Sequence, residues 1–341
     1  MSGGLPLQPG RQSAGERLLA FLRDRWFLTS LLVLIPVGYA VGQRKPPGVD
    51  GPDLSDYAAW VVAGVLFLMA LTLDSRKLRA SLARPTAVVW ACVVGLIGLP
   101  LITWPVCRLQ LTDDYRLGLV AVAAAPCTMA AASVWTRRAG GNDAVSLLTT
   151  LLTNGLCFVF TPALVAWLAG EAVSVDAAAM AWRLIKTALV PATAGQLTRL
   201  LLLRMADLDR LKTSLGVIAQ AGILVIVFGA SLKAGQQMTT AAGLGSGVAV
   251  AVMVASCLAI HLTAAAAAWW GGLAIGLSPA DAAATLFAGS QKTLPIAMLV
   301  VTDPQMLGSA GAALAPVPVL TYHALQLFAD TLIADRLRRG S

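Results

Sequence analysis

The sequence predicts an all-α polytopic membrane protein with ten transmembrane helices. Of its 341 residues, 57% are hydrophobic and only 12% are charged, whereas a typical soluble domain is about 25% charged. The charges also cluster between apolar runs, and each run is long enough for a helix to cross about 30 Å of hydrocarbon. The ten runs lie at residues 26–43, 57–73, 86–107, 117–136, 144–169, 180–202, 214–232, 244–271, 280–302 and 307–334.

Residues 1–25 precede the first span and are predicted to form a cytoplasmic arm. Leu5 to Gly10 is short and rich in proline, and Gly15 to Arg25 is charged. A cleavable signal needs an apolar core of about 7–15 residues before its cleavage site, and this segment contains none. The chain is expected to end in a short cytoplasmic tail at residues 335–341.

Basic residues indicate how the spans are oriented. Most of the 25 lysines and arginines lie in one alternating set of connecting segments, and the opposite loops carry many of the acidic residues. The positive-inside rule then places both termini in the cytoplasm. The net charge of +8 is explained by this orientation and by contact with anionic lipid headgroups, so nucleic-acid binding is not expected. The bias toward alanine, glycine and arginine suits a bacterial inner membrane.

Proline spacing suggests an internal repeat. Trp26 lies ten residues before Pro36 in span one, and Trp182 lies nine residues before Pro191 in span six. The two prolines are 155 residues apart, and the same shift carries Pro162 of span five between two prolines of span ten. Because five spans is an odd number, the second copy must enter the membrane from the opposite side. Chance placement of prolines is the alternative. The two copies are expected at residues 26–169 and 180–334.

Span four carries polar residues around a proline. Pro126 can break this helix, because proline lacks the N–H that an interior helical bond needs. Ser133 and Thr136 follow in the same span and are candidate substrate- or ion-binding residues.

Span five has a polar stripe. The hydroxyl and amide residues recur at i, i+3, i+4, i+7 and i+8, which places them on one helix face. Such a stripe points into a membrane bundle, where it either lines a site or makes interhelical hydrogen bonds. The residues are Ser146, Thr149, Thr150, Thr153 and Asn154.

Span nine contains a lysine near its centre. Lys292 at bilayer depth costs about 2.5–3.5 kcal/mol on insertion scales, and is tolerated only where it faces protein or water. Gly289 and Pro295 flank it and are expected to break the helix. A charge at a broken membrane helix is typical of a transporter's substrate or ion site. The neighbours that can pair with freed backbone groups are Ser290, Gln291 and Thr293.

The histidines His261 and His323 both lie in spans. Each either relays protons or stays neutral and hydrogen-bonded inside the bundle, which we favour. Asp330 shares a helix face with His323, but its position near the cytoplasmic end predicts that it snorkels or pairs with a nearby basic residue. Asp281, after Ser278-Pro279, is expected to cap the ninth helix.

The remaining patterns do not suggest an enzyme. The sequence contains no HExxH, P-loop, GxSxG or dinucleotide glycine fingerprint, and its isolated histidines lack metal-ligand spacing. The five cysteines form no CxxC pair and fall in or at the ends of apolar segments, which predicts small buried hydrophobes. No cofactor is expected other than Na⁺ or H⁺ as a coupling ion.

Two segments resemble a known family. They resemble helix-four and helix-nine motifs of the bile acid:sodium symporter superfamily, the latter in its SBF-like branch, which includes the vertebrate sodium/bile acid cotransporter 7 type. The resemblance covers about residues 26–335. The segments read Ala125-Pro126-Cys127-Thr128-Met129, followed by Thr136-Arg137-Arg138-Ala139-Gly140-Gly141-Asn142, and Gly289-Ser290-Gln291-Lys292-Thr293-Leu294.

This resemblance implies ten helices in a 5+5 inverted repeat, a core domain that moves against a panel domain, and broken helices four and nine that cross. It also implies two sodium sites, with Ser146 and Thr150 matching one and Gln291 the other. The chain departs from the family pattern at several ligand positions, which here hold Ala132-Ser133, Phe287, Lys292 and a residue near Gly95.

A fixed ammonium repels sodium at short range. We therefore infer that Lys292 takes the place of a sodium ion, either as a tethered cation or as a proton carrier. The predicted function is secondary active transport of a small organic anion or similar solute by alternating access. The alternatives are a proton-coupled antiporter, a non-transporting membrane sensor or assembly protein, and a membrane-embedded enzyme.

Overall fold

The computed structural model describes residues 26–44, 54–73, 85–129, 131–170, 175–202, 208–238, 247–303, 306–307 and 314–340. Within these ranges the protein is helical and no strand is found. The proposed N-terminal arm lies outside the described residues. The last helix continues to Gly340, so most of the expected C-terminal tail is its final turn.

Helix occupies each of the ten predicted spans. The first half contains α2 (Trp26–Arg44), α3 (Leu54–Thr72), α5 (Pro85–Val93), the π-helix η2 (Val94–Gly98), α6 (Leu99–Cys107), α7 (Asp113–Ala124), α8 (Ala131–Arg138), α9 (Asp143–Gly155) and α10 (Cys157–Ala169). The second half contains α11 (Ala177–Leu184), the π-helix η4 (Ile185–Leu189), α12 (Val190–Leu202), α13 (Leu208–Met238), α14 (Gly247–Ala274), α15 (Pro279–Ser290), α16 (Leu294–Thr302) and α17 (Pro316–Gly340).

Several of these helices can cross a membrane. By length and composition, five helical segments of the described chain qualify, or six if α9 and α10 form one span with a 69° bend. The segment from α15 through α16 is unlike the other four, because its most apolar window is wholly buried by protein. A polar group on this segment therefore faces protein and is shielded from lipid.

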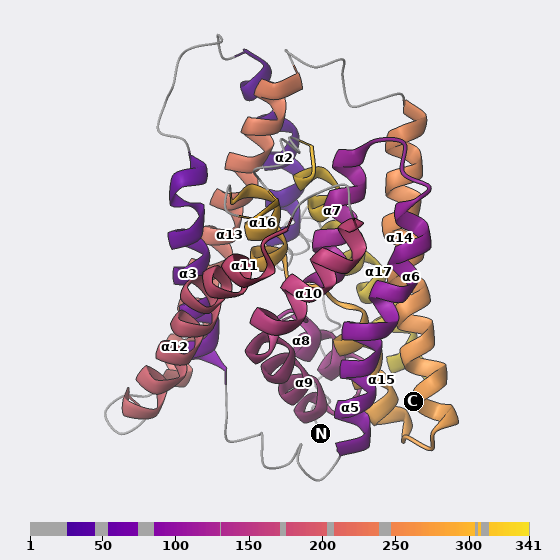
Figure 1. The fold of residues 1–341 in the computed structure, drawn as a ribbon. Coiled ribbons are helices and arrows are strands. Elements are labelled where there is room, and N and C mark those ends of the chain that lie inside the picture. Colours follow the sequence, from indigo (N-terminus) through magenta and orange to yellow (C-terminus); the bar gives the residue numbers. More distant parts are fainter. Residues whose placement is uncertain are drawn as a thin grey trace, which may run out of the picture.

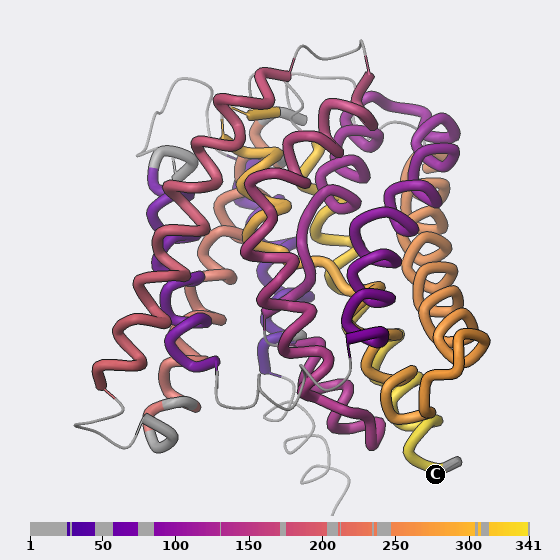
Figure 2. The backbone as a smooth tube through the Cα atoms, turned by 60° about the horizontal axis from the view of Figure 1, so that its bottom comes forward, coloured from indigo at the N-terminus to yellow at the C-terminus, as the bar shows by residue number. Residues whose placement is uncertain are grey.

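The helices pack as two groups. In the first, α2 and α3 pack against α13, and α3 also packs against η4 and α12, which continue α11 without a break. The second holds α5 to α10 and α14 to α17, with α15 in contact with α5, α8, α9 and α14. In two views, α12 and α14 lie at opposite sides of the molecule (Figure 1, Figure 2).

Each π-helix is followed by one residue and then by a proline. The N–H of Leu99 bonds to Val94 at the end of η2, and the N–H of Val190 bonds to Ile185 at the end of η4. The next residue is Pro100 in one case and Pro191 in the other. Since proline has no N–H, the second carbonyl of each π turn receives no donor from its own helix.

Helix continuity is lost at two predicted positions. Helix α7 ends at Ala124 and α8 begins at Ala131, so Pro126 lies between them. Helix α15 ends at Ser290, three residues before α16 begins at Leu294 with Pro295 in its first turn.

Gly289 was expected to break the helix, but it lies inside α15. Its missing side chain serves packing instead, because a Cβ there would lie 3.2 Å from Cβ of Val94 in η2. The expectation for Asp281 was also wrong. Ser278 caps α15 by accepting from the N–H of Asp281, and the Asp281 carboxylate accepts from Nδ2 of Asn142 at 2.8 Å.

Candidate functional site

Lys292 lies between α15 and α16, and its side chain is 3% exposed. Its ammonium group donates to the carbonyl oxygens of Gly95 at 2.6 Å, Ala123 at 2.9 Å and Ala125 at 2.8 Å. These oxygens come from η2, the end of α7 and the segment after α7. We call these three oxygens the carbonyl seat.

None of the three seat oxygens accepts a hydrogen bond within its own helix, and the sequence or local structure explains each case. The natural donor to Gly95 would be position 100, which is proline. The natural donor to Ala123 would be the N–H of Cys127, which instead donates to Oγ1 of Thr153 at 3.3 Å. Ala125 follows the end of α7 in extended conformation. The seat therefore exists because a π turn before a proline and the end of α7 leave these oxygens without helical donors.

The electrostatics of the seat favour a cation. Two of its oxygens lie at the C-terminal end of α7, where aligned peptide dipoles leave a partial negative charge. All three partners are carbonyl oxygens, which only accept, and a charged lysine has three N–H donors. A neutral amine has only two and would point a lone pair at the third oxygen. The geometry therefore fits a protonated Lys292.

Four other carbonyls at the end of α7 and in the segment after it accept hydrogen bonds from neighbouring segments. Thr161 donates to Ala124 at 2.8 Å, and the N–H of Thr293 donates to Pro126 at 2.9 Å. The span-five stripe supplies the next two donors. Asn154 donates to Cys127 at 2.8 Å, and Thr150 donates to Thr128 at 3.2 Å. Three members of the stripe, Thr150, Thr153 and Asn154, thus hold the non-helical segment in place.

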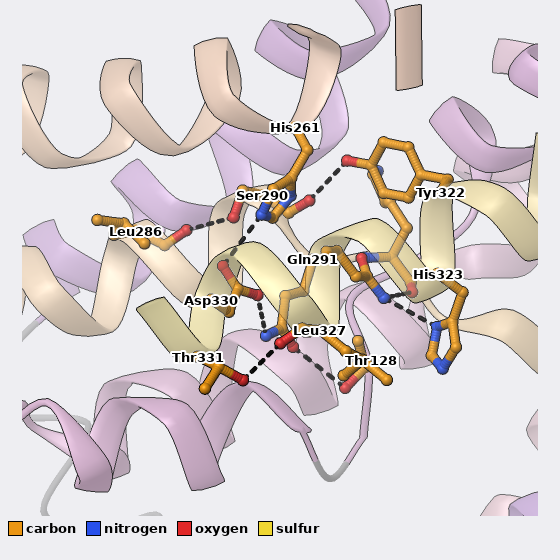
Figure 3. A network of polar contacts seen from close by, with 12 residues as sticks. Thr128, His261, Leu286, Ser290, Gln291, Tyr322, His323, Leu327, Asp330 and Thr331 are labelled. Atoms are coloured by element: carbon orange, nitrogen blue, oxygen red, sulfur yellow. Dashed lines mark hydrogen bonds and ion pairs between the residues drawn. The ribbon is translucent and has the colours of Figure 1, made fainter. Parts of the chain in front are cut away.

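The backbone of Lys292 is held separately from its side chain. The Gln326 carboxamide accepts from the N–H of Lys292 at 2.9 Å and donates to its carbonyl at 3.0 Å. The same Nε2 lies 2.9 Å from Nδ1 of His323. One turn away, the Tyr322 hydroxyl donates to the carbonyl of Ser290 at 2.9 Å (Figure 3). Helix α17 therefore supplies the polar partners of the break between α15 and α16.

Gln291 joins a second buried network (Figure 3). Its Nε2 donates to Asp330 at 2.5 Å, and its Oε1 accepts from Thr128 at 3.5 Å. The other Asp330 oxygen lies 3.0 Å from Nε2 of His261. Both Asp330 and His261 are fully buried. The expectation that Asp330 snorkels or pairs with a basic residue at the helix end was wrong, because α17 packs against α14 and the carboxylate faces His261 and Gln291.

Hydroxyl groups form a cluster between α8 and α9. The hydroxyl oxygens of Thr136 and Ser146 are 2.6 Å apart, and the Ser146 hydroxyl also donates to the carbonyl oxygen of Ala284 in α15 at 3.3 Å. The hydroxyls of Ser133 and Thr149 are buried, and neither has a hydrogen-bond partner in the described part of the chain.

The residues matched to the two sodium sites make hydrogen bonds within the protein. Ser146 is bonded to Thr136, Thr150 is bonded to Thr128, and Gln291 is bonded to Asp330 and Thr128. The glutamate position of the family holds Phe287, which is fully buried and offers no oxygen. At this position the side chain therefore lacks the oxygen ligand that the resemblance implies.

Comparison with known proteins identifies the family of this chain. A model of the SBF-like CPA transporter family matches residues 25–339. The chain belongs to this family. Membership makes it an integral membrane protein of a transporter family, as its apolar helices also indicate.

Relatives in this family span almost the whole chain. The sodium/bile acid cotransporter 7 of Rattus norvegicus is 24% identical over 94% of this chain and 95% of its own length. That of Danio rerio is 25% identical over 94% and 96%. An uncharacterized protein of Pseudomonas aeruginosa is 28% identical over 74% of each chain.

Sequence reasoning missed parts of the site that are made by backbone atoms or by α17. Gly95 and Pro100 create one oxygen of the carbonyl seat, and the only sequence signal was a proline inside an apolar span. Gln326 and Asp330 shared a helix face with His323, but their distance from span nine along the chain hid their role. Tyr322 had no signal beyond its place in an apolar helix.

Proposed function

We propose that the protein is a secondary active transporter that moves a small organic anion or similar solute by alternating access. The buried ammonium of Lys292 at the meeting point of two interrupted helices carries this proposal. Fixed charges at bilayer depth are costly and are kept where they serve a transport site. In this proposal the chain forms ten spans in a 5+5 inverted repeat, in which spans four and nine cross at Lys292.

The two packing groups act as the moving parts. The group of α2, α3, α13 and the continuous helical segment α11–η4–α12 is the panel, and the remaining helices form the core that carries Lys292. An ion pair links them: Nε of Arg183 in α11 lies 2.7 Å from the carboxylate of Asp303, which caps α16. Alternating access then consists of movement of the core against the panel, with this ion pair made in one state and broken in the other.

Lys292 serves as a tethered cation, so this transporter needs no sodium at that point. Two observations support the proposal: the ammonium occupies three carbonyl oxygens, and the matched sodium-ligand side chains are bonded to protein. The proposed location is a bacterial inner membrane, with both termini in the cytoplasm and anionic lipid against the basic segments.

Solute uptake into proteoliposomes tests this function. The set of organic anions tested begins with bile acids, which the names of the curated relatives suggest. Each anion is offered under an imposed sodium gradient, an imposed proton gradient or no gradient. We expect uptake that is independent of sodium and is lost in Lys292→Asn. Sodium-driven uptake by the unmodified protein would contradict the tethered-cation role, and no uptake of any anion would contradict the anion transporter.

A further inference from the structure

We propose that the carbonyl seat of Gly95, Ala123 and Ala125 is a binding site for a primary ammonium group in general. In the protein the tethered group of Lys292 fills it. When that side chain is shortened, a free alkylammonium ion takes its place. This inference rests on the proposed cation role of Lys292 but not on the identity of the transported solute.

The number and spacing of the acceptors define the ligand class. Three oxygens lie 2.6–2.9 Å from one nitrogen, within the range of charge-assisted hydrogen bonds. A primary ammonium offers three N–H donors and so satisfies all three oxygens. A quaternary ammonium offers none. A sodium ion must replace its hydration shell with oxygens, and the seat supplies only three of them.

The seat does not depend on the Lys292 side chain for its shape. Pro100, the Thr153 bond to Cys127 and the end of α7 leave the three oxygens without helical donors whatever residue occupies position 292. The backbone at 292 is also held independently, because Gln326 bonds to both its N–H and its carbonyl. Shortening the side chain therefore leaves three buried acceptors unsatisfied, which favours a ligand that restores the donors.

The chemistry of the substitution selects the probe. Lys292→Ala keeps Cβ and removes three methylene groups with the ammonium, a fragment equivalent to n-propylammonium. The space left behind is lined by the atoms that packed against the lysine stem. Lys292→Met is the matched control, because its unbranched side chain fills this space without supplying an N–H donor.

Thermal unfolding of the detergent-solubilised protein measures binding without any solute. We expect saturating n-propylammonium chloride to raise the Tm of Lys292→Ala by about 2–4 °C. The same salt should leave the unmodified protein and Lys292→Met unchanged, since their space is occupied. Sodium chloride and trimethylpropylammonium chloride should give no rise in Lys292→Ala.

An equal rise with the quaternary ion, or no rise with n-propylammonium, would overturn the proposal. If Lys292→Ala is recovered folded only when n-propylammonium is present during purification, that rescue supports it. If Lys292→Met folds but Lys292→Ala is unrecoverable with or without the amine, the seat does not accept a free ion. Neither thermal unfolding nor recovery of folded protein depends on transport. A failure of the ammonium-site proposal is therefore distinguishable from a failure of the proposed transport function.

Discussion

At the scale of single residues, the site consists of polar groups that compensate for interrupted helices. Lys292 supplies donors to three carbonyls, and Gln326 replaces the helical partners of Lys292 itself. A buried carbonyl or N–H left without a partner costs about 1–3 kcal/mol. The side chains that cover these groups therefore stabilise the non-helical backbone, and with it the position of the ammonium.

Gln326→Leu tests the support of Lys292. This change removes both hydrogen bonds to the Lys292 backbone, so we expect the free energy of unfolding to fall by about 1–3 kcal/mol and uptake to be lost. Gln110→Leu is the control, because Gln110 bonds to Val106 and Ser256 away from the carbonyl seat. Uptake equal in the two variants would show that Gln326 contributes only general stability.

Thr150→Val tests the span-five stripe. Thr150 donates to the carbonyl of Thr128, so its loss frees the segment after α7 and should lower uptake. Thr149→Val is a close control on the same helix, since the buried Thr149 hydroxyl has no hydrogen-bond partner among the described residues. Val145→Ala, a change in packing alone, should impair uptake less than Thr150→Val. Equal effects of all three would favour a packing role for the stripe.

At the scale of elements, the π-helix η2 and the breaks after α7 and α15 expose the backbone groups on which the site depends. A π turn followed by proline presents a carbonyl that no donor in the helix can reach. In η2 this carbonyl belongs to Gly95 and lies against Lys292. The close approach of η2 to α15 at Gly289 brings the Gly95 carbonyl and Lys292 together. The π turn therefore leaves the Gly95 carbonyl oxygen available to bind the ammonium group.

Pro100→Ala tests this origin. The new N–H at position 100 can donate to Gly95 and compete with Lys292 for its oxygen, so we expect reduced uptake. Pro105→Ala, in the same helix α6, adds an N–H without affecting Gly95 and should keep uptake near that of the unmodified protein. An unchanged Pro100→Ala would mean that the Gly95 oxygen is dispensable to the seat.

At the scale of the whole molecule, the helices form two groups that are not the two halves of the sequence. Helices from both halves meet in each group, as α2 with α13 and α7 with α17. The Arg183–Asp303 ion pair spans the groups, whereas the Arg138–Asp335 pair joins α8 to α17 within one of them. If the groups move against each other, only the first pair must separate.

Cross-linking checks this movement. We expect a short bis-maleimide to block uptake by the doubly substituted Arg183→Cys, Asp303→Cys protein, because it ties core to panel. The same reagent on Arg138→Cys, Asp335→Cys should leave uptake intact, since both positions move together. Undiminished uptake by the cross-linked first pair would contradict relative movement of the groups at this point.

The sequence by itself determined the helical membrane class, the positions of the helices and the family, and it indicated that the charge of Lys292 is buried. These follow from apolar run length and from the cost of a buried charge, both of which are local properties. The tertiary structure decided which atoms surround that charge. Two of the oxygens around it come from α7 and its adjoining segment and one from η2. Every residue has a backbone carbonyl, so residue types in the sequence do not show which carbonyls will contact the charge. Asp330 was misplaced for the same reason, because its distance from a helix end is visible in the sequence but the neighbours of its helix face are set only by packing.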